Sequence, residues 1–205
     1  MSLEPGPDFD LRDGDLLFQD LAGRGATAIE VVSPGFNGAE VSHVGIHLWI
    51  GTVNYVVEAF PPEVRLTPLP VYLRRARDEL DRPRVFVGRL KPEYEHLIPD
   101  AVEEALSMRG LPYDRVYLTG EDAYYCSELV VDAFKYANGG AEVFPEHPMS
   151  FRDPATGAIL DYWVSYYRYF GRPVPEGEPG SNPGELSMSD KIEVLHRYGF
   201  LTNWR

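Results

Sequence analysis

Cysteine is nearly absent from this chain, since the 205 residues contain one, Cys126. A single cysteine excludes an intramolecular disulfide, and it excludes metal sites that are built from several thiolates. Free cysteines are most often small buried residues without chemistry of their own. Cys126 therefore needs support from its surroundings before it can be considered a nucleophile.

Positive charge is also scarce, with 19 Lys and Arg against 32 Asp and Glu, and the formal net charge is -13. Such a surface repels phosphate backbones and anionic membrane surfaces, so we expect no nucleic-acid partner. The charge is compatible with a small neutral or cationic substrate in a cleft. The sequence leaves the oligomeric state open.

Long hydrophobic runs are missing as well. No apolar run approaches the roughly 20 residues that cross a bilayer, so we expect no stable membrane insertion. The first eight residues, MSLEPGPD, carry neither a basic segment nor an apolar one, and no signal peptide is visible. We therefore expect a soluble protein that is cytoplasmic as the sequence stands, while an exported form with a removed leader stays open.

The residues that are present suit a single folded domain. Hydrophobic residues make up 44% of the chain and aromatic residues 13%, which is enough for a sizeable core. We expect a flexible lead-in over residues 1–11 and a domain over residues 12–170. Residues 171–205 would then form a Pro/Gly-rich extension with a closing helix, packed on the same domain.

Hydrophobic periodicity predicts an α+β fold, with a small and mostly antiparallel sheet packed against helices. The clearest signal is a hairpin around residues 51–54. Residues 70–79 are rich in arginine and read as a solvated helix or loop, and residues 161–170 read as a strand or a helix. The predicted strands cover 16–18, 41–50, 53–60, 63–66 and 85–90, and the predicted helices cover 22–33, 92–109, 126–137 and 190–200.

Cys126 stands at the start of a predicted helix, and this position favours a reactive thiol. A helix N-terminus carries a partial positive charge and backbone N–H groups without intrahelical partners. Both features stabilise a thiolate, and the same N–H groups can donate to an oxyanion that develops on an attacked carbonyl.

A nucleophilic cysteine needs a base, and two of the five histidines lie on a predicted strand. His43 and His47 are four residues apart, so their side chains share one face of the sheet. Alternation alone does not choose between them. The other three histidines, His96, His147 and His196, fit exposed or locally hydrogen-bonded positions better.

Glu58 is the candidate for the group that orients the base. It interrupts the apolar strand Val56–Ala59, on the strand that pairs with that of His43. A carboxylate there can fix the imidazole tautomer and stabilise the imidazolium. The alternative is that Glu58 points to solvent from the polar face of its strand.

Several short motifs around these residues resemble the NlpC-type papain-like peptidases. Gly110-Leu111-Pro112-Tyr113 matches the Gly-x-Pro-Tyr element that precedes the nucleophile in that family. Tyr125-Cys126-Ser127-Glu128 corresponds to its Asp-Cys-Ser-Gly helix start, with Glu128 in place of the glycine. Ser42-His43-Val44-Gly45-Ile46 resembles its histidine strand.

The order of these motifs is changed, because the histidine and glutamate strands come before the cysteine helix. This order is similar to that of the circularly permuted YiiX/YebB-like branch, and the resemblance covers about residues 12–137. It implies a permuted papain-like catalytic domain. It also implies Cys126 as nucleophile, His43 as general base and then acid, and Glu58 as orienting group.

The resemblance further implies Tyr113 as an oxyanion or substrate contact, with Tyr125 and His47 as secondary candidates, and it implies no metal or organic cofactor. The expected activity is hydrolysis of amide bonds in small peptides, cell-wall-type peptides among them, or in N-acyl amino acids. Two alternatives stay open: a lipid acyltransferase or acylhydrolase of the lecithin retinol acyltransferase-like type, and a catalytically silent binding domain. We also expect the chain after residue 140 to fold over the cleft and shape substrate access.

Overall fold

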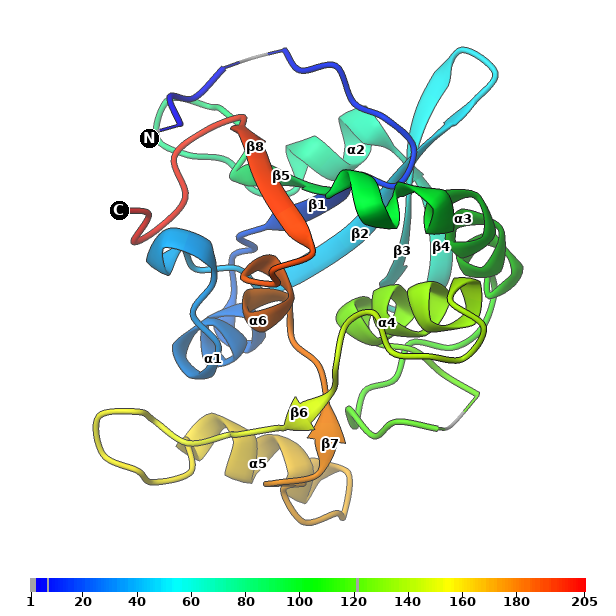
Figure 1. The fold of residues 1–205 in the computed structure, drawn as a ribbon. Helices are drawn as coiled ribbons and strands as arrows, with labels where there is room; N and C mark the ends of the chain where they lie inside the picture. The colour runs from blue at the N-terminus through cyan, green and yellow to red at the C-terminus, as the bar shows by residue number, and fades with distance from the viewer. Residues whose placement is uncertain (1–2, 7, 121) are drawn as a thin grey trace.

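The computed structural model describes residues 3–6, 8–120 and 122–205. Among these residues, six antiparallel strands form one sheet in the order β4-β3-β2-β1-β5-β8 (Figure 1). A separate short pair joins β6 (His147–Pro148) to β7 (Pro179–Gly180). The strands of the main sheet are β1 (Leu16–Gln19), β2 (His43–Ile50), β3 (Val53–Phe60), β4 (Glu63–Pro68), β5 (Val85–Leu90) and β8 (Ile192–Arg197).

The predicted hairpin is confirmed as β2 and β3. Ile50 pairs with Val53, so the turn consists of Gly51 and Thr52. Gly51 has a φ of 62°, a left-handed conformation that glycine adopts without steric cost. β2 begins at His43 instead of Val41, which places the histidine at the very start of the strand.

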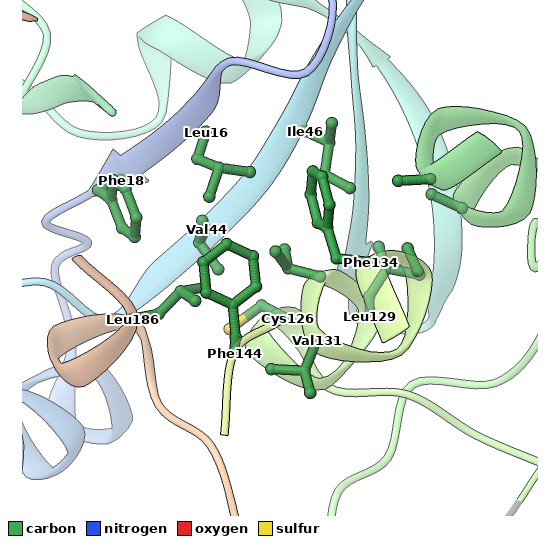
Figure 2. Close-up of a cluster of buried hydrophobic side chains, with 14 of the residues drawn as sticks. Leu16, Phe18, Val44, Ile46, Cys126, Leu129, Val131, Phe134, Phe144 and Leu186 are labelled. Atoms are coloured by element: carbon green, nitrogen blue, oxygen red, sulfur yellow. The ribbon is translucent and has the colours of Figure 1, made fainter. Parts of the chain in front are cut away.

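Helices cover both faces of the sheet, which is why its strands are buried on both sides. On one face, α3 (Ile98–Ser107) and α4 (Cys126–Ala137) pack on Val44 and Ile46 in the main core (Figures 1 and 2). On the other face, α2 (Leu69–Arg74) places the fully buried Tyr72 against Val56. Among the described residues, no helix is both long enough and apolar enough to cross a bilayer.

The apolar face of α4 fixes the position of Cys126, and Leu129 is at its centre. Its side chain is fully buried in the main core. Replacing Leu129 by alanine should therefore lower the free energy of unfolding by about 2–5 kcal/mol, as chemical denaturation would measure. Leu80→Ala is the matched control, because Leu80 is 67% exposed. Equal losses in the two variants would contradict this account of the core.

One prediction for the C-terminal region is wrong. Residues 190–200 do not form a closing helix, because Ile192–Arg197 pair with β5 and close the sheet as β8. The helix of the Pro/Gly-rich extension lies earlier in the chain, as α6 (Pro183–Ser187), and most of it is buried. The hydrophobic pattern of β8 is short and interrupted by Glu193, and only pairing with a distant strand makes it extended.

Elsewhere the structure refines the predicted elements. The helix predicted over 22–33 is α1 (Arg24–Val32), and the predicted helix over 92–109 begins with a 3₁₀ segment, Pro92–Leu97, before α3. The ambiguous segment 161–170 is the helix α5 (Asp161–Tyr169). Trp163 of α5 packs with Ala28 of α1 in a separate small core.

Candidate active site

Cys126 is the first residue of α4, as predicted. The preceding Tyr125 has an extended backbone, with φ of −95° and ψ of 171°, and its N–H donates to Glu128 Oε2 at 3.3 Å. This backbone-to-carboxylate contact across the first turn fixes where the helix begins. Cys126 is only 5% exposed, so its thiol lies at the helix N-terminus in a largely dry environment.

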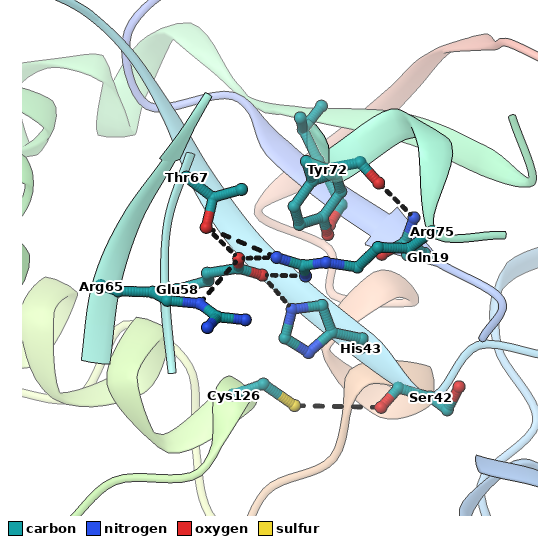
Figure 3. Close-up of polar contacts among 10 residues, drawn as sticks. Gln19, Ser42, His43, Glu58, Arg65, Thr67, Tyr72, Arg75 and Cys126 are labelled. Carbon is teal, nitrogen blue, oxygen red and sulfur yellow. Dashed lines mark hydrogen bonds and ion pairs between the residues drawn. The ribbon is translucent and has the colours of Figure 1, made fainter. Parts of the chain in front are cut away.

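The structure brings His43 and Cys126 together at the start of β2. Cys126 Sγ lies 3.9 Å from the carbonyl oxygen of Ser42, the residue before His43. The His43 ring lies between the Cys126 sulfur and the Glu58 carboxylate (Figure 3). Nε2 of His43 is 2.6 Å from Glu58 Oε2, which leaves Nδ1 for the side of the sulfur.

The charges around His43 favour the imidazolium. Burial alone would lower the pKa of His43, but hydrogen bonds to Cys126 and Glu58 outweigh it and raise the pKa to about 9. At neutral pH the ring therefore holds a proton while it contacts the thiol. An imidazolium beside the sulfur is the electrostatic environment that activates a nucleophilic thiol.

Glu58 is fully buried, and four side chains lie close to its carboxylate: His43, described above, and three others. Thr67 donates to Glu58 Oε1 at 2.5 Å, and Arg75 donates to both carboxylate oxygens, with Nη1 at 2.6 Å from Oε2. Arg65 Nε lies 3.9 Å from Oε1. Burial raises the pKa of Glu58, but hydrogen bonds from Arg75 and His43 outweigh it and lower the pKa to about 2. Glu58 therefore faces His43 as a permanent carboxylate.

Arg75 and Thr67 are site residues that the sequence reasoning missed. Arg75 follows α2 in the segment that was expected to be solvated, yet its side chain is only 13% exposed. Its guanidinium also stacks 4.0 Å from the centre of the Phe60 ring. Nothing in the arginine-rich pattern distinguishes Arg75 from its neighbours, because its role arises from a contact across 17 residues of chain.

His47 is not brought to the nucleophile. It shares the face of His43, as the alternation requires, but it lies further along β2 and is fully buried. Its Nδ1 is 2.9 Å from the carbonyl oxygen of Arg12, and its Nε2 is 2.6 Å from Asn54 Oδ1. Both ring nitrogens thus have protein partners, and these contacts give His47 a structural position.

The two candidate tyrosines lie on either side of the loop before α4. Burial, and next the charge of Cys126, raise the pKa of Tyr113, so this hydroxyl lies within electrostatic reach of the thiolate. The Tyr125 hydroxyl accepts a hydrogen bond from the N–H of Ser181 at 3.0 Å. Tyr125 therefore ties the nucleophile helix to the C-terminal region.

Cys126 lines a pocket of about 90 Å³ whose walls come largely from the chain after residue 140. Apolar side chains dominate, and Met149, Phe151 and Trp163 belong to this later part. The expectation that the tail shapes substrate access stays a prediction. The remaining wall residues are Ile29, Val32, Ser33, Tyr117, Tyr125, Ser127, Pro148, Ser150, Ser181, Asn182, Pro183 and Glu185.

The sequence is similar to those of known proteins. Residues 10–196 match the family described as "Permuted papain-like amidase enzyme, YaeF/YiiX, C92 family". The "Uncharacterized protein YiiX" of Escherichia coli (strain K12) is 28% identical over 126 residues, which are 62% of this chain and 58% of that protein. The match thus spans less than two thirds of that relative's length.

A solved structure shares the fold. The crystal structure of metalloprotein yiiX from Escherichia coli O157:H7 superposes with a TM-score of 0.73 at 22% sequence identity, covering 92% of this chain and 98% of that one. The described residues of this chain contain no group of three or more His, Cys, Asp or Glu side chains that could hold a metal ion.

Proposed function

This chain belongs to the permuted papain-like amidase family of the YaeF/YiiX type, and we propose that its Cys126, His43 and Glu58 form the catalytic triad of a thiol amidase. The observation that carries the proposal is the His43 ring, which lies between a thiol at a helix N-terminus and a buried carboxylate (Figure 3). This is the geometry of an activated nucleophile, in which the base is itself oriented by a third group.

The proposed reaction is acyl transfer in two steps. The Cys126 thiolate attacks the amide carbonyl, a C–S bond forms, and the carbonyl π electrons move to oxygen. Backbone N–H donors at the start of α4 and the Tyr113 hydroxyl stabilise that oxyanion. When the oxyanion collapses, the C–N bond breaks and the imidazolium of His43 gives its proton to the leaving amine.

Water then completes the cycle. Neutral His43 takes a proton from a water molecule, whose oxygen attacks the thioester carbonyl, and the C–S bond breaks as the acid is released. The proton taken from water leaves His43 as the imidazolium, and cleavage of the C–S bond leaves Cys126 as the thiolate. Throughout, the Glu58 carboxylate accepts the Nε2 proton of His43, which keeps Nδ1 directed at the sulfur.

The apolar pocket beside Cys126 supports a substrate with an apolar acyl group, such as an N-acyl amino acid. Met149, Phe151 and Trp163 would contact such a group, because apolar walls gain free energy by covering apolar surface. The same pocket also supports the second candidate, an acyltransferase or acylhydrolase acting on lipids. The two activities share the acyl-enzyme and differ in the acceptor and the leaving group.

Intact-protein mass spectrometry tests the proposal. We expect the wild-type protein, mixed with N-acyl amino acids and quenched in acid, to carry one acyl group on Cys126 and to release free amino acid. Acyl amino acids with longer apolar chains should react faster than acetyl amino acids or cell-wall-type tripeptides. Phospholipid vesicles, with and without an alcohol acceptor, test the second candidate.

Cys126→Ala is the control in each reaction, and it should show neither the acyl adduct nor turnover. If wild-type protein forms no acyl adduct with any of these substrates or with an activated ester, the amidase proposal is wrong. Turnover that persists in Cys126→Ala would contradict it equally.

A further inference from the structure

Glu30 is a buried acidic residue that the proposed reaction does not use. It lies in α1 and is only 5% exposed. Moving a carboxyl group out of water costs free energy unless hydrogen bonds compensate, and burial raises the pKa of Glu30 to about 7. The hydrogen bond that Glu30 makes in this environment therefore indicates what its position serves.

The partner of Glu30 is Ser42, the residue before His43. The Ser42 hydroxyl donates to Glu30 Oε1 at 2.8 Å, and it accepts the N–H of Leu21 at 3.1 Å. The N–H of Ser42 donates to the carbonyl oxygen of Gln19 at 3.1 Å. Because Ser42 is 5% exposed, water competes little for these three hydrogen bonds. They hold Ser42 between α1 and the end of β1.

The carbonyl group of Ser42 lies beside the nucleophile. Its oxygen is 3.9 Å from Cys126 Sγ (Figure 3). The same carbonyl belongs to the peptide that leads into His43, which is paired with Gln19 in the sheet. The hydrogen bonds of Ser42 thus fix the one peptide that both contacts the sulfur and carries the imidazole.

The link to Glu30 also reaches the pocket beside Cys126. Ile29 and Val32 of α1 line this pocket, and Glu30 lies between them in the sequence of the helix. The hydrogen bond from Ser42 to Glu30 therefore joins one wall of the pocket to the start of β2. Without it, the buried Ser42 hydroxyl would lose its acceptor, and such a group costs about 1–3 kcal/mol until the chain rearranges or water enters.

We propose that Glu30 is a positioning residue, which acts through the Ser42 hydroxyl to hold the Ser42–His43 peptide against Cys126. The inference rests on the proposed function, because it concerns the same thiol and the same imidazole. Neither the Glu30 nor the Ser42 side chain exchanges a proton with the substrate. Their effect is geometric, since a misplacement of about 1 Å at a reacting centre can lower a rate about 100-fold.

Alkylation of Cys126 by iodoacetamide at pH 6 tests the inference, because this small reagent reports the thiolate and needs no acyl pocket. Glu30→Ala removes the acceptor, and Ser42→Ala removes the hydroxyl but keeps the backbone carbonyl. We expect each variant to alkylate about tenfold more slowly than wild type. The double variant should lose no more than either single variant, because both remove the same link. Glu30→Gln keeps an acceptor oxygen and should stay within about threefold of wild type.

Val31→Ala is the matched control, since Val31 is a neighbour in α1 that is 40% exposed, and its rate should equal that of wild type. Thermal denaturation identifies the variants that are folded during the assay. If Glu30→Ala is not folded, Ser42→Ala decides, because it makes the smaller change.

The inference is overturned if the folded alanine variants alkylate at the wild-type rate, if Glu30→Gln loses as much as Glu30→Ala, or if the two single losses multiply in the double variant. A different result would count against the proposed function itself. If alkylation of wild type falls below pH 8.5 as that of free cysteine does, the thiol is not activated, and this inference fails together with the proposed function.

Discussion

Replacing His43 by glutamine is expected to lower kcat/KM for amide hydrolysis by about 10⁴-fold. Glutamine can hydrogen-bond to Glu58, but it can neither hold the proton that the leaving amine needs nor stabilise the thiolate as an imidazolium does. The rate of Cys126 alkylation by iodoacetamide at pH 6 should fall in the same variant, because less of the sulfur is then thiolate. Steady-state kinetics measures kcat/KM, and mass spectrometry of the alkylated protein measures the rate of alkylation.

His96→Gln is the control for His43→Gln, since His96 is exposed in the 3₁₀ segment before α3 and should be replaceable without effect. The wild-type pH profile adds a further check. The pKa of His43 is raised to about 9, so the imidazolium persists at neutral pH and is lost as the pH rises through about 9. Activity on amides should fall along that limb. An unchanged alkylation rate in His43→Gln would show that His43 does not activate the thiol.

Glu58→Gln is expected to have the second-largest effect, lowering kcat/KM by about 10²–10⁴-fold and the free energy of unfolding by about 3–5 kcal/mol. Activity falls because an amide holds the imidazole tautomer less firmly and no longer stabilises the imidazolium. The alkaline limb should therefore move to lower pH. Stability falls because Arg75 loses its buried carboxylate partner.

Arg75→Met separates these two effects of Glu58→Gln. The double variant Glu58→Gln/Arg75→Met no longer buries an uncompensated guanidinium. We therefore expect it to regain most of the lost stability while its activity stays low. The sign of the pH dependence follows from the lowered pKa of Glu58, which is about 2 in the folded protein and 4.5 in the reference state. The stabilisation by Glu58 is complete above pH 4.5 and is lost as the pH falls through about 2, so wild type and Glu58→Gln should converge there. If the double variant regained activity, the carboxylate would not be needed for the chemistry.

The elements with strong local signals could be predicted from the sequence. The β2–β3 hairpin has an alternating pattern around a glycine turn, and α4 has a clear apolar face that begins at Cys126. Short motifs and their order predict the approach of His43 to Cys126. It could not be derived from spacing alone, because the two residues are 83 positions apart in the chain.

What could not be predicted depends on contacts between distant segments. The local pattern predicts a helix over Ile192–Arg197, but antiparallel pairing with the edge of β5 makes this segment a strand. Arg75 looked like a solvated arginine, and only the folded hairpin presents Glu58 to it. The loop before α4 is hydrogen-bonded at Arg115 and Val116 to hydroxyls of α5, a segment that the sequence left ambiguous between strand and helix.

The closing strand β8 has a consequence for how proteins with this fold can diversify. The segment after α4 that supplies Met149, Phe151 and Trp163 to the pocket is anchored at both ends, by α4 before it and by β8 after it. Lengthening or shortening a segment between two fixed ends costs little conformational entropy, since each doubling of its length adds only about 0.6 kcal/mol. Insertions and deletions there can therefore reshape the walls of this pocket while Cys126, His43 and Glu58 keep their places.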